Sequence, residues 1–257
     1  MNGKVRHSLR LTAMLYLLDY GAGNIQSLAN SLTKLGYTYE WVREPSDISK
    51  ADKLLFPGVG SFASAMDALH AKGYVEPLRA YIQSGKPLMG ICVGMQVLFE
   101  GSDESPGVQG LGIVPARVGR FATQDAFGRK AVPHMGWSLA NVVEWDGCAD
   151  QRHELAKSYG MHDANPSHYY FVHSYRVAWD ANVAEWALTT TQYGNEIFVS
   201  SIQHANVFAT QFHPEKSGQA GLDLLAAWLQ LEHVEPTTRV GRPVSSTEHM
   251  PTRRIVA

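Results

Sequence analysis

Cys92 is the residue best suited to nucleophilic chemistry in this sequence of 257 residues. It stands in Gly90-Ile91-Cys92-Val93-Gly94, after a short apolar run and before a helical pattern. Small residues on both sides allow a sharp strand-to-helix turn that presents the side chain, the arrangement called a nucleophile elbow. The N-terminus of the following helix would stabilise a thiolate and offer backbone N–H groups to a developing oxyanion. The alternative is that Cys92 is a small buried hydrophobic residue, as free cysteines often are.

His213 is the best candidate for the base that a thiol nucleophile requires. It follows the apolar run Val207–Thr210, so it is expected at the end of a strand. Its imidazole could accept the thiol proton and return it to a leaving amine. Glu215, two residues later across a proline, could hold the ring in one tautomer. In α/β-hydrolases the acid precedes the histidine, whereas here His213 precedes Glu215, which disfavours an esterase.

Alternating strand and helix patterns must position these side chains. Strands are expected at Leu15–Leu18, Tyr37–Val42, Lys53–Phe56 and Pro87–Ile91, and helices at Asn24–Leu35, Phe62–Ala71, Val75–Ser84 and Val93–Phe99. After Gly110 short β segments dominate, at Gly112–Val118, Tyr169–Val172, Trp186–Thr191, Ile197–Ser201 and Val207–Gln211, and a helix follows at Gly218–Leu231. A parallel first half and a mixed second half predict a three-layer α/β domain with a mostly parallel central sheet and a smaller mixed β region.

The two ends of the chain differ from this folded unit, which we place at residues 14–232. Residues 1–13 carry Lys4, Arg6 and Arg10 and no acidic residue, so they are interpreted as an N-terminal extension with a faint likeness to a transit peptide. Residues 233–257 are rich in Pro, Thr and Ser and are interpreted as a linker.

Composition excludes several classes of protein. The formal net charge is −2, so no general attraction to nucleic acid or an anionic membrane is expected. The only cysteines, Cys92 and Cys148, exclude a disulfide scaffold and a Cys-rich zinc module. No apolar run is long enough to cross a bilayer. These observations predict a cytoplasmic enzyme-sized protein.

Two glycine-rich turns, Gly21-Ala22-Gly23 and Gly58-Val59-Gly60, invite comparison with nucleotide-binding loops. Each lacks the third glycine of the dinucleotide fingerprint, and neither carries the Gly-Lys-Ser/Thr of a phosphate loop. They are interpreted as tight strand-to-helix turns, and no cofactor is expected.

Six sequence blocks together resemble the imidazole glycerol phosphate synthase family, whose glutaminase is a class I (triad) glutamine amidotransferase. They occur in register over about residues 15–232, at Leu18–Asn24, Phe56–Phe62, Gly90–Gln96, Pro133–Trp137, Tyr170–Tyr175 and Gln211–Ser217. The resemblance implies a flavodoxin-like fold and hydrolysis of L-glutamine to glutamate and ammonia, without a cofactor or metal. It also implies a (β/α)8-barrel cyclase partner, which uses the ammonia to form imidazole glycerol phosphate and AICAR in histidine biosynthesis.

The resemblance assigns roles to the residues that match. Cys92 would form a γ-glutamyl thioester, His213 would act as base and then acid, and Glu215 would orient the imidazole. The Val93 backbone N–H would be one oxyanion donor, and a second would come from the turn at Val59 and Gly60 after a rearrangement. The implied glutamine-binding set is Gly58, Gln96, Glu104, His173, Ser174 and Tyr175. For the last two, a capped strand end is the alternative.

A second group of residues would dock on the cyclase. It comprises Asn24, Pro133, His134, Met135, Gly136, Trp137 and Lys216. We place these residues at strand-end turns and expect His134 and Trp137 to be exposed, since aromatic side chains favour interfaces. Internal packing is the alternative for Trp137.

The last residues, Pro251–Ala257, resemble the opening of a barrel's first strand. The chain is therefore expected to be the N-terminal part of a glutaminase–cyclase fusion of the fungal and plant type, with a plastid location if the source is a plant. A separate glutaminase subunit is the alternative. Two other functions also remain open: a triad amidotransferase that serves a different acceptor, and a catalytically silent regulatory protein.

Overall fold

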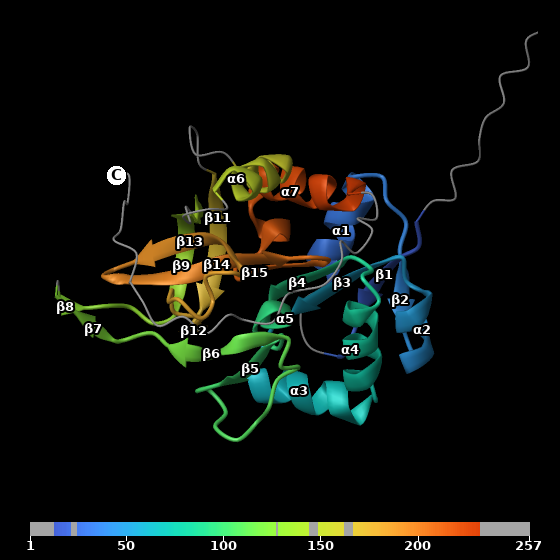
Figure 1. The fold of residues 1–257 in the computed structure, drawn as a ribbon, viewed down its shortest axis with the longest axis horizontal. Coiled ribbons are helices and arrows are strands. Elements are labelled where there is room, and N and C mark those ends of the chain that lie inside the picture. The colour runs from blue at the N-terminus through green and yellow to red at the C-terminus, as the bar shows by residue number, and fades with distance from the viewer. Residues whose placement is uncertain (1–12, 22–24, 127, 144–148, 162–166, 232–257) are drawn as a thin grey trace, which may run out of the picture.

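The fold is organised around an eight-stranded sheet, shown in Figure 1. The computed structural model describes residues 13–21, 25–126, 128–143, 149–161 and 167–231. The strands of the sheet are β1 (Leu15–Leu18), β2 (Glu40–Val42), β3 (Lys53–Gly58), β4 (Leu88–Cys92), β10 (Asn141–Val142), β13 (Ala187–Tyr193), β14 (Glu196–His204) and β15 (Val207–Thr210). Their order is β10-β13-β14-β15-β4-β3-β1-β2. Strands β15, β4, β3, β1 and β2 pair in parallel, and the rest pair antiparallel, which confirms the predicted mixed architecture.

Helices cover both faces of this sheet. They are α1 (Gln26–Lys34), α2 (Pro45–Lys50), α3 (Phe62–Ala71), α4 (Val75–Gln83), α5 (Val93–Gln96), α6 (Ala149–Ser158) and α7 (Gly218–Gln230), with a 3-10 turn η1 (Pro214–Lys216). In Figure 1, α1 and α7 lie on one side of the sheet and α3 and α4 on the other. Every residue of β1 and β4 is buried, as parallel strands between two helical layers require.

Smaller sheets extend the strand-rich half. Strands β5 (Phe99–Ser102), β6 (Val114–Arg120) and β12 (Tyr175–Arg176) form one of them, β9 (His134–Leu139) pairs with β11 (His168–His173), and β7 (Gln124–Asp125) pairs with β8 (Gly128–Arg129). Strands β9 and β11 matter most for the site, because their antiparallel register sets His134 opposite His173 and Trp137 opposite Tyr170.

The sequence-based elements were wrong in several places. The helix expected over Val93–Phe99 ends at Gln96, and Phe99 begins β5. The block Pro133–Trp137, expected as a turn, contributes most of its residues to β9. Helices α2 and α6 were missed, although α2 has Pro45 in its first turn and a capping box between Glu44 and Asp47.

Lys53 ties the start of β3 to the end of α7. Its side chain is buried, and its ammonium donates to the backbone carbonyls of Trp228, Leu229 and Leu231 at 3.4, 2.5 and 2.5 Å. Burial lowers the pKa of Lys53. The carbonyl end of a helix is where a cation is stabilised, so this contact joins the last helix to the central sheet.

The expected N-terminal extension, linker and cyclase opening fall almost wholly on residues 1–12 and 232–257, outside the described residues. Within the described part of the chain, no helix has the length and apolarity needed to cross a membrane.

Candidate active site

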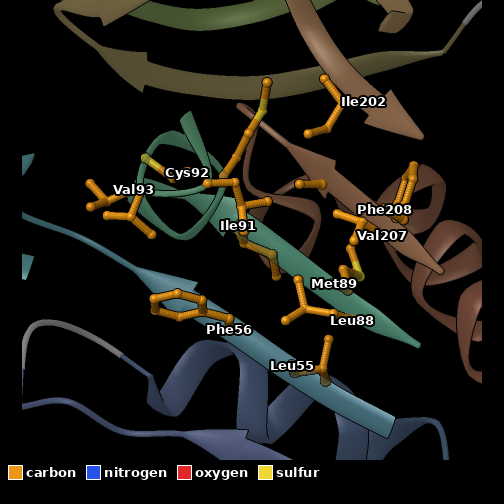
Figure 2. Close-up of a cluster of buried hydrophobic side chains, with 14 of the residues drawn as sticks. Leu55, Phe56, Leu88, Met89, Ile91, Cys92, Val93, Ile202, Val207 and Phe208 are labelled. Atoms are coloured by element: carbon orange, nitrogen blue, oxygen red, sulfur yellow. The ribbon is translucent and has the colours of Figure 1, made fainter. Parts of the chain in front are cut away.

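Three neighbouring parallel strands end at one edge of the sheet, and the candidate catalytic residues lie at those ends. Strand β4 ends at Cys92, and Gly58 at the end of β3 is its register partner. On the other side, Thr210 at the end of β15 is paired with Ile91. Figure 2 shows Cys92 where β4 turns into α5, with Phe56 on β3 on one side and Phe208 on β15 on the other. In open α/β sheets this carboxyl edge is where ligands bind.

The backbone at Cys92 has the strained geometry of an elbow. Its φ is 56° and its ψ is −110°, a region that non-glycine residues rarely occupy. Such a conformation costs about 1–3 kcal/mol and persists only where the surroundings enforce it. Here Gly94 permits it, because a Cβ there would lie 1.9 Å from the Phe56 carbonyl oxygen. The expected strand-turn-helix around Cys92 is therefore present.

His213 and Glu215 form a buried pair directly after β15. Nδ1 of His213 lies 2.7 Å from Oε1 of Glu215. The turn is held by the His213 N–H, which donates to the Tyr170 carbonyl at 2.9 Å, and by the Ser217 hydroxyl, which donates to the His213 carbonyl at 2.6 Å. Burial lowers the pKa of His213, but the Cys92 thiolate and the Glu215 carboxylate outweigh it and raise the pKa to about 10. The negative charges beside the ring therefore favour its imidazolium form.

A cavity of about 460 Å³ opens beside Cys92 and His213. Most of the residues expected at the site line it: Val59, Gly60, Cys92, Val93, Gln96, Glu104, Pro133, His173, Ser174, Tyr175, His213 and Lys216. Gly58 does not, and a Cβ on Gly58 would lie 2.6 Å from the Gly94 nitrogen and 2.8 Å from the Tyr20 hydroxyl. Its glycine is explained by this close approach of β3 to the elbow.

The two expected sources of oxyanion donors both border the cavity. Val93 is the first residue of α5, so its N–H belongs to the helix N-terminus next to Cys92. Gly60 has a φ of +103°, which glycine adopts without strain. The turn that it shares with Val59 therefore has the conformational freedom that the expected rearrangement needs.

Polar side chains around the cavity are held by specific hydrogen bonds. Glu104 Oε2 accepts the Phe62 N–H at 2.8 Å, at the start of α3. Gln96 Nε2 donates to the Tyr175 carbonyl at 3.0 Å and to Gln211 Oε1 at 2.9 Å. No group of three or more His, Cys, Asp or Glu side chains in the described part of the chain is arranged to hold a metal ion.

His173 uses both ring nitrogens inside the protein. Nδ1 lies 2.8 Å from the Tyr175 carbonyl oxygen, and Nε2 lies 3.4 Å from Nδ1 of His134. Burial lowers the pKa of His173 to about 3, so the ring is neutral. Its ring therefore orders the wall of the cavity, and its expected contact with glutamine stays a prediction.

Gln211 is the functional candidate that sequence reasoning missed. It directly follows β15, and its side-chain Nε2 lies 3.8 Å from Cys92 Sγ. Its place one residue beyond Thr210, the register partner of Ile91, sets it beside Cys92. Only a correct pairing of β15 with β4 could have revealed this.

Strand β9 sorts the expected docking residues onto two faces. Met135 and Trp137 are 62% and 54% exposed, as expected for Trp137. His134 is only 2% exposed, so the expectation of an exposed ring was wrong. It stacks on Tyr193 at 4.1 Å, and burial, with a smaller effect from Lys130, lowers its pKa to about 4. The reason is the period-2 alternation of a strand, which a turn does not have.

The remaining expected docking residues lie outside β9 or outside the described part of the chain. Pro133 and Lys216 are exposed at the rim of the cavity. Asn24 lies outside the described residues, as does Cys148.

Comparison with known proteins places the chain among enzymes of one kind. Residues 16–229 match the family model described as glutamine amidotransferase class-I. The chain is 44% identical over 246 residues to imidazole glycerol phosphate synthase hisHF of Emericella nidulans, covering 95% of this chain and 42% of that protein. It is 41% identical over 218 residues to imidazole glycerol phosphate synthase subunit HisH of Methanothermobacter thermautotrophicus, covering 85% of this chain and 98% of that protein.

Solved structures show the same fold at lower identity. A structure titled glutamine amidotransferase has a TM-score of 0.59 at 20% identity, covering 83% of this chain and 98% of that one. The chain spans less than half the length of the first curated relatives that it matches. Together with the elbow and its buried His–Glu pair, the family match leads to one conclusion: the chain belongs to the class I glutamine amidotransferase family.

Proposed function

We propose that this chain hydrolyses L-glutamine through a thioester on Cys92 and that the ammonia serves imidazole glycerol phosphate synthesis. The observation that carries the proposal is that the strained elbow at Cys92 and His213 line one cavity, with Glu215 bonded to Nδ1 of His213. The names of the relatives support the synthase role, since both fused and separate glutaminase proteins of that synthase align with this chain.

The reaction begins with a thiolate–imidazolium pair. The Cys92 sulfur attacks the γ-carbonyl carbon of glutamine, and the carbonyl oxygen becomes an oxyanion that the Val93 N–H stabilises. Collapse of this intermediate breaks the C–N bond, and His213 gives its proton to the departing nitrogen, which leaves as ammonia. The neutral imidazole then takes a proton from water, whose oxygen attacks the thioester and releases glutamate. The second tetrahedral intermediate collapses with cleavage of the C–S bond, so Cys92 leaves as the thiolate while His213 keeps the proton taken from water, and the γ-carboxyl proton of glutamate is lost to solvent.

Glu215 and the cavity wall support these steps. The Glu215 carboxylate holds Nδ1 of His213 at 2.7 Å, which leaves Nε2 to serve the reaction. Gln96, Glu104, Ser174 and Tyr175 are proposed to bind the glutamine backbone, with the Glu104 carboxylate suited to its ammonium group. His173 and Gly58 are proposed to shape the site through packing.

The exposed face of β9 is proposed to dock on a (β/α)8-barrel cyclase, with Met135 and Trp137 as its apolar anchors. Pro133 and Lys216 are proposed to surround this contact, so that ammonia passes between the proteins without entering solvent. Asn24, which lies outside the described residues, is proposed as a further docking residue. Residues 14–232 would form the glutaminase, and residues 233–257 would lead into a fused cyclase. A cytoplasmic location, or a plastid in a plant, follows from this assignment.

A glutaminase assay with and without a cyclase partner and its nucleotide ligand tests the proposal. The isolated chain should be a poor glutaminase, because an oxyanion site that lacks one donor loses about 10²–10³ in rate. Addition of the liganded cyclase should restore turnover. Full turnover by the isolated chain would contradict the need for a rearrangement at Val59 and Gly60, and no turnover in either case would contradict the function.

The reaction that receives the ammonia is tested separately, because other triad amidotransferases share the glutaminase step. Expression of the complete gene in a strain that lacks its own synthase should relieve histidine auxotrophy. A glutaminase that is active but does not relieve the auxotrophy would identify a different acceptor.

A further inference from the structure

Gln211 is packed against the nucleophile from the side opposite β3. The residue is fully buried, and its backbone N–H donates to the Ser200 carbonyl at 2.9 Å. Its side-chain Nε2 lies 3.8 Å from Cys92 Sγ, within the range of a hydrogen bond to sulfur. A buried side chain with this contact either packs against the nucleophile or affects the charge and position of the Cys92 sulfur.

The orientation of the Gln211 amide is fixed by Gln96. Gln96 Nε2 has two hydrogens, and both go to carbonyl oxygens: one to Tyr175 and one to Gln211 Oε1. A flipped Gln211 would set two NH₂ groups against each other and turn its own oxygen toward the sulfur. The amide must therefore present its N–H to Cys92.

The Tyr175 carbonyl that anchors Gln96 is itself the end of a buried chain of hydrogen bonds. The low pKa of His173 makes its ring neutral, and because the Tyr175 carbonyl can only accept, Nδ1 of His173 carries the proton and donates to it. Nε2 of His173 then accepts from His134 Nδ1. Nε2 of His134 then accepts from the Ser138 hydroxyl at 3.0 Å. Each hydrogen bond in this chain therefore has a single possible donor. The chain connects the Gln96–Gln211 pair to His134 and Ser138 on β9 and fixes its orientation.

We propose that Gln211 is a positioning residue for the nucleophile, whose side-chain N–H stabilises the Cys92 thiolate and aims the sulfur before substrate arrives. A neutral donor is suited to this task because it favours the anion without competing with His213 for the proton. The catalytic consequence rests on the proposed glutaminase function, whereas the effect on the thiolate does not.

Several titratable side chains lie around Cys92, in addition to the neutral amide of Gln211. His213 lies at the end of β15, His173 on β11, and Glu104 and Lys216 on other parts of the cavity wall. The buried Tyr20 hydroxyl lies against Gly58. All of them stay in place when Gln211 alone is changed, so a change in thiolate formation is attributable to its amide.

The test is the pH dependence of Cys92 alkylation by iodoacetamide in the full chain, in a Cys148→Ser background so that one thiol is followed. Gln211→Glu keeps the acceptor for Gln96 but sets a carboxyl oxygen against the sulfur. The alkylation midpoint should move up by about one pH unit. Gln211→Met removes the donor without adding charge and should move the midpoint up by a smaller amount.

Gln192→Glu makes the same chemical change at an exposed position on β13 and should leave the midpoint unchanged. Near-ultraviolet circular dichroism and thermal melting establish that each variant is folded. A folded Gln211→Met or Gln211→Glu protein with the midpoint of the parent would overturn the proposal.

A second readout separates this proposal from the proposed function. In the chain assembled with its cyclase, Gln211→Met should lower kcat for glutamine by about tenfold, with the acid limb of the pH profile moved to higher pH. Shifted alkylation in a protein that does not hydrolyse glutamine would retain the role of Gln211 and reject the glutaminase.

Discussion

The elbow around Cys92 and the β9–β11 pair form two walls of the same cavity, yet they are determined in different ways. At the elbow, the turn itself is made by residues close in sequence, namely the buried strand β4, Cys92 at φ 56° and Gly94, although Gly94 packs against the Phe56 carbonyl of β3. At β9 the same few residues look like a turn until Tyr170 and His173 are paired with them across the chain. The turn that presents Cys92 can therefore be recognised from local residues, whereas the exposed face of β9, which we propose as a docking surface, depends on long-range pairing.

The largest expected effect tests the elbow. Cys92→Ala should abolish glutamine-dependent synthesis by the complete enzyme and leave ammonia-dependent synthesis largely intact, because only the thioester step is lost. Both activities are measured on the same preparation, with Cys148→Ser as the matched control. A parallel fall in the two activities would mean that the substitution disturbs folding or docking.

The next effect probes the packing that enforces the elbow. Gly94→Ala should destabilise the fold by about 3 kcal/mol or prevent its formation, because the new Cβ would overlap the Phe56 carbonyl oxygen at 1.9 Å. Urea unfolding followed by circular dichroism measures this loss. An unchanged unfolding midpoint would show that the strand ends can separate, and the distinction between the two regions would weaken.

The proposed docking surface on β9 should respond in the opposite way. Trp137→Ala should leave thermal stability unchanged but weaken cyclase binding by about 2 kcal/mol, roughly 30-fold in Kd. Titration calorimetry with a separately produced cyclase gives the value. Met14→Ala is the matched control, since Met14 is also an exposed apolar residue but lies away from β9. Equal loss in the two variants would argue against β9 as the contact.

The smallest effect concerns the buried face of β9 and depends on pH. The folded-state pKa of His134 is lowered to about 4, so the unfolded chain binds the proton more readily. Its contribution to stability is complete above about pH 6.5 and is lost as the pH falls toward 4, by at most about 1.4 kcal/mol per pH unit.

His134→Gln should therefore reduce the loss of stability between pH 7 and pH 5, measured by urea unfolding at each pH. His168→Gln, an exposed histidine on β11, serves as the control and should not change the slope. If stability fell with pH equally in His134→Gln and in the parent protein, His134 would have to accept a proton in the folded state.

Sequence patterns were sufficient for several elements whose signal is local, although α2 was missed despite its local capping box. The strands at Leu15–Leu18 and Lys53–Phe56 and the helix at Phe62–Ala71 were predicted within two residues, because apolar runs and 3.6-residue periodicity mark them directly. Family resemblance named the candidate site residues, most of which the structure brings to one cavity.

The rest depended on pairing that periodicity does not encode. The buried position of His134 requires β9 to be a strand against β11, and the contact of Gln211 with Cys92 requires the register of β15 on β4. Helix α6 was missed because its described turns carry few apolar residues, so tertiary context rather than amphipathic pattern holds it.

Lys53 sets a limit on how the protein can be shortened. Its buried ammonium has the carbonyls of Trp228, Leu229 and Leu231 as acceptors, and a truncation before these residues would remove all three of these hydrogen bonds. Such a protein should lose more stability than the missing apolar area alone accounts for. Amide hydrogens in the last turn of α7 should exchange together with those of β3. Neither element can open without breaking the hydrogen bonds between the Lys53 ammonium and the carbonyls at the end of α7.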